Sequence, residues 1–190
     1  MTTRVGPLII VSGPSGSGKS TVIARVLQEA KVPLRVSVSA TTRPPRPGER
    51  EGVHYHFWTR EQFLQQVQAG AFLEWAEVHG NYYGTLRDEV EPYRAQGIGV
   101  ILDIDVQGAA QVRQFCPDNV SIFLRTPSLE VLEQRLRARG TEDEASLARR
   151  LANARREMER IGEYDFVVVN DDLGKAVAEV RELLARQFRE

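Results

Sequence analysis

The residue types and spacing that bind a triphosphate occur in one segment, Gly13-Pro14-Ser15-Gly16-Ser17-Gly18-Lys19-Ser20, followed by Thr21. Glycines let backbone N–H groups turn inward, so that many donors can reach the phosphate oxygens. Lys19 would supply a mobile cation for the β- and γ-phosphates, and Ser20 a hydroxyl for Mg²⁺. The alternative is a chance glycine-rich turn. It is disfavoured because an apolar strand is predicted before the segment and a helix after it.

Two acids, Asp103 and Asp105, end the apolar run that starts at Val100 and are candidates for holding a metal or substrate. In open parallel sheets, ligands bind outside the carboxyl ends of the strands, so these side chains would lie at the functional edge. We expect Asp103 to join Ser20 around Mg²⁺. The alternative is that either acid is an ordinary helix cap or loop carboxylate.

A second anion site is indicated by Arg43 and Arg46, which are three residues apart in a proline-rich loop. Two forked guanidinium groups there could grip one phosphate dianion. Tyr55 and Tyr83 could give further O–H bonds to phosphate. The alternatives are that the arginines are solvated loop residues and that the tyrosines pack in a core.

Glu74 lies between Leu73 and Trp75 in an apolar stretch that reads as a strand. A carboxylate only accepts hydrogen bonds, and guanine offers N–H donors at N1 and N2. Glu74 is therefore a candidate for reading a guanine base. Alternation along a half-exposed strand leaves open that Glu74 faces solvent instead.

Arginines that could reach a transferring phosphoryl group occur at Arg139, beside Gly140, and at Arg150. Phosphoryl transfer needs charge neutralised on the equatorial oxygens and water excluded, which two arginines on a closing segment could provide. A solvated basic helix face is the alternative, and it suffices for neighbours such as Arg155 and Arg156.

The elements that must position these residues alternate along the chain. Short apolar runs predict strands at 8–11, 35–38, 99–105, 119–124 and 165–169, and helical periodicity predicts helices at 19–30, 128–138 and within 137–160. Asp171 and Asp172 could cap a last helix that runs to about Phe188. The alternation predicts an α/β fold in which helices cover both faces of a parallel sheet.

Residues 41–84 interrupt this alternation. Pro44, Pro45 and Pro47 exclude a helix through 41–52, and residues 53–84 are rich in aromatic side chains. Thr59 and Gln62 have capping-box spacing and could open a helix to about residue 69. We interpret the stretch as a small insertion with short strands and its own small core.

The composition fits one globular domain, with 190 residues, 42% hydrophobic, and a net charge of −1. That charge disfavours binding a long nucleic acid. The single cysteine, Cys116, allows no internal disulfide, and we find no targeting segment or run of about 20 apolar residues. We expect a cytoplasmic monomer or homodimer without a membrane partner. His54, His56 and His79 fit no metal spacing or triad, so no role is assigned to them.

Three further blocks, at 39–55, 72–85 and 102–108, narrow the interpretation. They include Ser39-Ala40-Thr41-Thr42-Arg43, Phe72-Leu73-Glu74-Trp75-Ala76 and Leu102-Asp103-Ile104-Asp105-Val106-Gln107-Gly108. Together with the phosphate loop they resemble the guanylate kinase family from about Leu8 to Leu184. The resemblance implies a three-layer P-loop NTPase fold with a parallel sheet. It implies a core at about 1–38, 90–136 and 162–190, a mixed α/β nucleotide-monophosphate-binding insertion at about 39–89, and a helical lid at about 137–161.

The resemblance also implies an activity, ATP + GMP = ADP + GDP with Mg²⁺, and we expect dGMP to be accepted too. Residue by residue, it assigns the GMP phosphate to Arg43, Arg46, Tyr55 and Tyr83, and the surroundings of the guanine to Ser39, Glu74, Gly84, Thr85 and Asp105. It assigns transfer to Lys19, Arg46 and the lid arginines Arg139 and Arg150. It places Asn170 near the adenine.

Two alternatives stay open at this point. A kinase of the same build could act on another phosphate, such as a ribose bisphosphate, but such an acceptor would not need the guanine-reading pair Glu74 and Thr85. A binding module for phosphopeptides is the other, and the intact phosphate loop with Lys19 and Ser20 argues against it.

Overall fold

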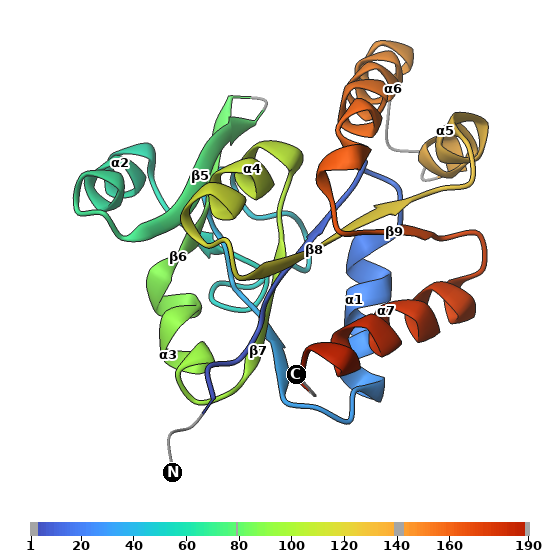
Figure 1. The fold of residues 1–190 in the computed structure, drawn as a ribbon. Helices are drawn as coiled ribbons and strands as arrows, with labels where there is room; N and C mark the ends of the chain where they lie inside the picture. The colour runs from blue at the N-terminus through green and yellow to red at the C-terminus, as the bar shows by residue number, and fades with distance from the viewer. Residues whose placement is uncertain (1–3, 79, 139–142, 189–190) are drawn as a thin grey trace. The chain divides into compact units, whose positions relative to one another are not determined.

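The computed structural model describes residues 4–78, 80–138 and 143–188, and its elements follow the predicted α/β alternation (Figure 1). The chain divides into two compact units. The first unit comprises Met1–Leu8, Leu34–Leu102 and Gln107–Asn119. The second comprises Ile9–Pro33, Asp103–Val106 and Val120–Glu190.

The second unit is built on parallel strands. β1 (Leu8–Ser12) is buried along its whole length and neighbours β8 (Asn119–Arg125), which pairs in parallel with β9 (Phe166–Val169). The register sets Ile122 opposite Phe166. β1 and β8 show the apolar runs typical of buried parallel strands, whereas Val167 and Val169 of the edge strand β9 are exposed.

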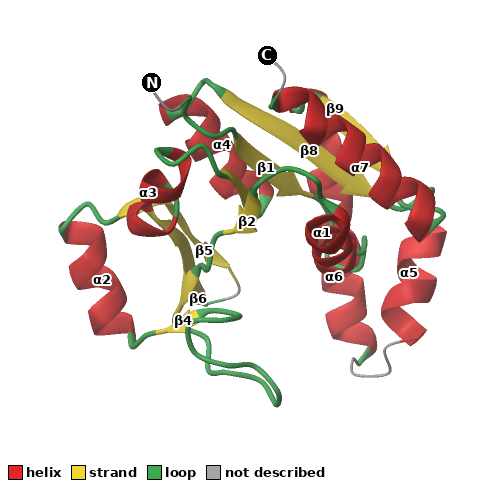
Figure 2. Ribbon diagram, turned by 90° about the horizontal axis from the view of Figure 1, so that it is seen from below, coloured by secondary structure: helices red, strands yellow, loops and turns green. Residues whose placement is uncertain are grey.

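Two helices of this unit lie side by side, α1 (Lys19–Glu29) and α7 (Leu173–Gln187), as Figures 1 and 2 show. Val22, Ile23 and Val26 form the buried face of α1. The predicted cap of α7 is confirmed, since the Asp172 carboxylate accepts a hydrogen bond from the Lys175 N–H.

A second helix pair, α5 (Leu129–Ala138) and α6 (Glu144–Glu159), packs through a leucine cluster (Figure 1). Leu132 and Leu136 of α5 meet Leu147 and Ala154 of α6, so the helical periodicity predicted within 137–160 corresponds to a buried face. Asp143 caps α6 by accepting from the Ser146 N–H. The short 3₁₀ helix η2 (Ile161–Glu163) follows.

The first unit contains two groups of strands. β2 (Leu34–Val36) pairs in parallel with β7 (Gly99–Asp103), with Leu34 opposite Gly99. A four-stranded mixed sheet has the order β4-β3-β6-β5, formed by β3 (Ala40–Thr41), β4 (His56–Phe57), β5 (Phe72–Val78) and β6 (Asn81–Leu86). β6 is antiparallel to both β3 and β5, whereas β3 and β4 are parallel.

The aromatic stretch forms the small core predicted for it. Helix α2 (Arg60–Gln68) starts at the predicted capping box of Thr59 and Gln62, and its Phe63 is fully buried. Phe63 stacks on Phe72 with ring centroids 4.4 Å apart and on Tyr82 at 5.4 Å. Figure 2 shows α2 standing beside this sheet.

Some elements differ from prediction. The strand predicted at 99–105 ends at Asp103, so Asp105 does not end it and instead stands directly before an unpredicted helix, α4 (Val106–Phe115). Gly108 lowers helix propensity there and hid the helical spacing of the buried Val106, Ala109 and Val112. The short η1 (Arg87–Glu89) and α3 (Glu91–Arg94) were also missed. Within the described ranges, no helix is long and apolar enough to cross a membrane.

Candidate active site

The phosphate loop in the second unit joins the end of β1 to the start of α1, as predicted. Gly13 has φ 143° and Gly18 has φ 94°, a region that side chains disfavour. A Cβ at Gly13 would collide with the Leu124 carbonyl oxygen, and one at Gly18 with the Asn170 amide. The close approach of neighbouring backbone and side chains therefore requires glycine at both positions.

The N-terminus of α1 has the features of an anion-binding site. Its first turn carries no acid, and in the part of the chain that the structure describes no side chain caps it. Lys19 Nζ donates to the Gly13 carbonyl at 2.7 Å, which folds the cation back over the loop. The Ser17 hydroxyl is buried and has no hydrogen-bond partner among the described residues. Such an N-terminus offers N–H donors and positive charge to phosphate oxygens.

Ser20 and Asp103 lie together at the predicted metal position. Ser20 Oγ donates to Asp103 Oδ2 at 3.5 Å. Burial raises the pKa of the Asp103 carboxyl, while the charge of Lys19 and the Ser20 hydrogen bond oppose that rise. These oxygen donors suit Mg²⁺, which takes one or two protein oxygens and completes its shell with phosphates and water. Across 4–78, 80–138 and 143–188, no group of three or more His, Cys, Asp or Glu side chains gathers around a possible ion.

Asn170 lies at the back of the phosphate loop. Its side-chain amide donates to the Ser17 backbone carbonyl at 2.8 Å, and its backbone carbonyl accepts from the Arg135 guanidinium at 2.8 Å. Asn170 is thus held against the loop and helps to fix its shape. Its predicted place near the adenine stays a prediction.

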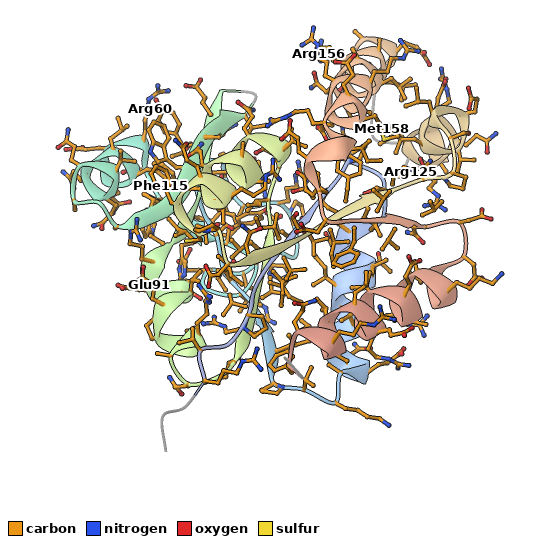
Figure 3. All side chains as sticks on the ribbon, viewed as in Figure 1. Arg60, Glu91, Phe115, Arg125, Arg156 and Met158 are labelled. Carbon is orange, nitrogen blue, oxygen red and sulfur yellow. The ribbon has the colours of Figure 1, made fainter. Side chains whose placement is uncertain are left out.

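The lid arginines are placed only in part. Arg150 lies on α6, and Arg139 falls outside the described residues. Arg155 and Arg156 are exposed, and Figure 3 shows Arg156 pointing outward from α6, as expected for a solvated face. The roles of Arg139 and Arg150 in transfer stay predictions.

Glu157 of α6 is an acid near this site that sequence reasoning missed. Burial raises the pKa of its carboxyl, the charge of Lys19 opposes the rise, and the charge of Asp105 adds to it. Three residues after the buried Ala154, it shares the inward side of α6. The spacing from Ala154 was the one sequence signal for Glu157, and the many arginines of this segment made the helix look like a solvated basic face.

Three of the four predicted phosphate ligands of the first unit lie in contact, namely Arg43, Tyr55 and Tyr83. Arg43 lies over the Tyr55 ring, with 5.5 Å from Cζ to the ring centroid, and Tyr55 and Tyr83 meet edge to face at 6.1 Å. Arg43 donates to Glu49 at 2.9 Å, and this hydrogen bond raises the pKa of Arg43 and lowers that of Glu49. Glu49 also accepts from the Arg46 N–H at 2.7 Å, so it organises the loop that carries both arginines.

Glu74 is buried, which rejects the solvent-facing alternative. It lies on β5 opposite Thr85 of β6, and the Thr85 hydroxyl donates to Glu74 Oε1 at 2.7 Å. A Cβ at Gly84 would clash with the Phe72 ring at 2.6 Å, so Gly84 lets β5 and β6 approach closely. The pair presents a carboxylate held by a neighbouring hydroxyl.

Two further predicted base contacts lie on different units. Ser39 directly precedes β3 in the first unit, where its carbonyl accepts from the His56 N–H at 2.9 Å. Asp105 belongs to the second unit, directly before α4.

Comparisons with known proteins show which family the chain resembles. The family model described as Guanylate kinase matches residues 6–187. The guanylate kinase of Synechococcus sp. (strain JA-3-3Ab) is 51% identical over 179 residues, covering 94% of this chain and 82% of that protein. The guanylate kinase of Symbiobacterium thermophilum is 54% identical over 179 residues, covering 94% of this chain and 84% of that protein.

Solved structures show the same fold. The crystal structure of guanylate kinase from Anaplasma phagocytophilum has a TM-score of 0.81 and 34% identity, covering 98% of this chain and 88% of that chain. A gluconokinase from Sinorhizobium meliloti 1021 has a TM-score of 0.51 and 20% identity, covering 98% of this chain and 95% of that chain, and shares the fold alone.

Proposed function

The chain belongs to the guanylate kinase family, and on this premise we propose how its residues carry out the phosphorylation of GMP to GDP by ATP. It is an enzyme of the phosphotransferase class, with ATP as the phosphoryl donor. The observation that carries the substrate assignment is the buried pair of Glu74 and Thr85 on neighbouring strands.

Glu74 reads the base. Its carboxylate accepts from guanine N1–H and N2–H, whereas adenine presents a lone pair at N1 and no amine at C2. Because Thr85 donates its only hydroxyl proton to Glu74, Thr85 fixes the carboxylate, and Ser39 is the hydroxyl left to donate to guanine O6. Adenine would face a buried acceptor without a donor, and such mismatches give the largest rejection ratios.

Arg43, Arg46, Tyr55 and Tyr83 bind the GMP phosphate. The guanidinium of Arg43 is stacked near Tyr55 and held by Glu49, so it is oriented before substrate arrives. The GMP phosphate is already anionic and needs no dedicated base. One of its oxygens attacks the γ-phosphorus of ATP, and the bond from that phosphorus to the β–γ bridging oxygen breaks to release ADP.

The phosphate loop residues 13–21 bind the ATP phosphates. Lys19 moves from the Gly13 carbonyl to the β- and γ-phosphates, whose charge competes for it. Mg²⁺, held by Ser20 and Asp103, supplies neutralising charge when bound. Arg139 and Arg150 stabilise the transferring group, and Asn170, held against the loop, contacts the adenine.

Membership of the family also supports proposals on domain boundaries, a further substrate, assembly and location. We propose a core, insertion and lid at the boundaries given by the sequence, use of dGMP beside GMP, and a cytoplasmic monomer or homodimer that binds neither nucleic acid nor membrane. The net charge of −1 supports the last point.

The test is the substrate preference of Glu74→Gln. The amide keeps one acceptor and loses the charge. The kcat/KM for GMP should therefore fall by a factor that corresponds to about 1.5–3 kcal/mol of lost transition-state stabilisation, the worth of a hydrogen bond to a charged group. AMP gains nothing from the carboxylate, so its kcat/KM should change little and the GMP-to-AMP ratio should narrow.

ADP release measured with GMP, dGMP, AMP and UMP gives the ratios in both proteins, and circular dichroism checks the fold. An unchanged GMP-to-AMP ratio would show that Glu74 does not read the base.

A further inference from the structure

The side chain of Gln111 on α4 bonds both backbone polar groups of Trp75 on β5. The Trp75 N–H donates to Gln111 Oε1 at 3.3 Å, and Gln111 Nε2 donates to the Trp75 carbonyl at 2.8 Å. β5 is an edge strand in the order β4-β3-β6-β5, so these groups point away from β6. Gln111 therefore replaces a neighbouring strand at this one residue (Figure 1 shows α4 beside β5).

Trp75 directly follows Glu74, where the pairing of β5 with β6 is irregular. Phe72 faces Leu86 and Glu74 faces Thr85, so one extra residue of β5 is accommodated between them. A bulge of this kind re-aims side chains and interrupts the ladder. The backbone beside Glu74 is thus secured from the outer edge by Gln111 as well as from β6.

Helix α4 is a firm support for this contact. Ala109 and Val112 are fully buried, and Val112 is the residue next to Gln111. Side chains on packed helices are placed more exactly than side chains on loops. The outer edge of β5 is therefore tied to a packed part of the molecule.

We propose that Gln111 is a positioning residue for guanine recognition, holding the Glu74 carboxylate through the backbone of Trp75. This inference rests on the proposed role of Glu74. Hydrogen bonds weaken steeply when distance and angle depart from ideal values, so a loosened β5 would weaken the bonds from guanine N1–H and N2–H. The base-specific part of GMP binding should suffer, and the chemistry at the phosphates should not.

The experiment compares Gln111→Met with Gln114→Met. Methionine keeps the length of the side chain and removes both bonds, and Gln114 is an exposed residue of the same helix. For Gln111→Met we expect the KM for GMP to rise about 10-fold, the scale of one or two net hydrogen bonds. The KM for ATP, the kcat at saturating GMP and the kcat/KM for AMP should stay within about 2-fold, and Gln114→Met should match the unmodified enzyme.

Gln111→Glu is a second variant, which keeps the acceptor for the Trp75 N–H and loses the donor to its carbonyl. Because its carboxylate sets an acceptor against that carbonyl, we expect a rise in the KM for GMP at least as large as that of Gln111→Met. An unchanged KM for GMP in both Gln111 variants, or equal losses for GMP and ATP, would overturn the proposal.

Glu74→Gln measured in parallel separates this failure from failure of the proposed function. If Glu74→Gln narrows the GMP-to-AMP ratio while the Gln111 variants do nothing, only the role of Gln111 is wrong. If Glu74→Gln leaves the ratio unchanged, the guanine assignment of Glu74 fails, and the role of Gln111 fails with it.

Discussion

At the scale of single residues, Lys19 has the sharpest expected effect. Its ammonium contacts the Gly13 carbonyl and lies half-buried beside the loop, so it contributes charge and little packing. Lys19→Met should lower kcat by roughly 10²-fold or more, the scale of removing one preorganised charge stabiliser. The fold should survive, which circular dichroism and a thermal melt can verify. Near-normal turnover in a folded variant would contradict the assigned role.

The roles of the phosphate-loop residues could be predicted from sequence, because phosphate binding requires glycines, a lysine and a hydroxyl at fixed spacing. Glu74 could not be settled that way, since alternation allowed either face, and only its burial beside Thr85 decides between them. Glu49 and Gln111 were missed for a different reason. Both act on backbone groups of other residues, and such contacts leave no local pattern in the sequence.

At the scale of elements, a cluster around Glu89 ties together strands on both sides of the predicted boundary of the insertion. Glu89 of η1 accepts from Arg35 of β2 at 2.5 Å, and its other oxygen lies 3.2 Å from Nε2 of His56 on β4. Nδ1 of His56 lies 3.2 Å from Glu51. His56, which fitted no motif, therefore bridges two carboxylates within the predicted insertion, and the bond from Arg35 to Glu89 joins that insertion to β2.

This cluster predicts an acid-sensitive contribution to stability. Burial acts to raise the pKa of Glu89, but the bond with His56 and the charge of Arg35 outweigh it, so the pKa is lowered from its ordinary 4.5. A lowered folded-state pKa means that the contribution is present above the unfolded value and is lost as the pH falls through the folded value. Glu89→Gln should therefore be less stable by about 1.5 kcal/mol near neutral pH, and the gap should shrink in acid.

Urea unfolding would measure the difference in the free energy of unfolding between Glu89→Gln and the unmodified protein, at neutral pH and near pH 3. The exposed Glu179→Gln serves as the matched control, because it removes one carboxylate without touching the cluster. A gap between Glu89→Gln and the unmodified protein that stays constant across this range would contradict the prediction.

Elements with a complete local signal were predicted well. The capping box of α2 and the Asp172 cap of α7 place helix starts within a residue, because side chains there bond the first free N–H groups. Helix α4 lacked such a signal: it follows β7 after two residues and contains Gly108. Its existence depends on tertiary burial of Val106, Ala109 and Val112, which a local pattern does not report.

At the scale of the whole molecule, the predicted site residues are divided between two compact units. Arg43, Tyr55 and Glu74 belong to the first, and Lys19 and Asp103 to the second. The site residues of each unit could be predicted from the sequence, because the residue types in each unit match the chemistry of one substrate. The predicted domain closure would depend on both ligands and on the whole chain, so no single motif encodes its extent.

The chemistry of phosphoryl transfer predicts that the enzyme changes shape when both substrates are bound. In-line transfer needs the GMP phosphate and the ATP γ-phosphate adjacent and sheltered from water, although both are hydrated and highly charged. A two-substrate analogue that links the nucleosides through a polyphosphate should therefore compact the enzyme, by closing the 41–84 and 139–160 segments over the core. Small-angle scattering should show a smaller radius of gyration with the analogue than with GMP or ATP alone, because only the analogue fills both sites. Curves that superimpose with and without saturating analogue would contradict closure, and the phosphates would then have to meet in a molecule whose shape does not depend on substrate.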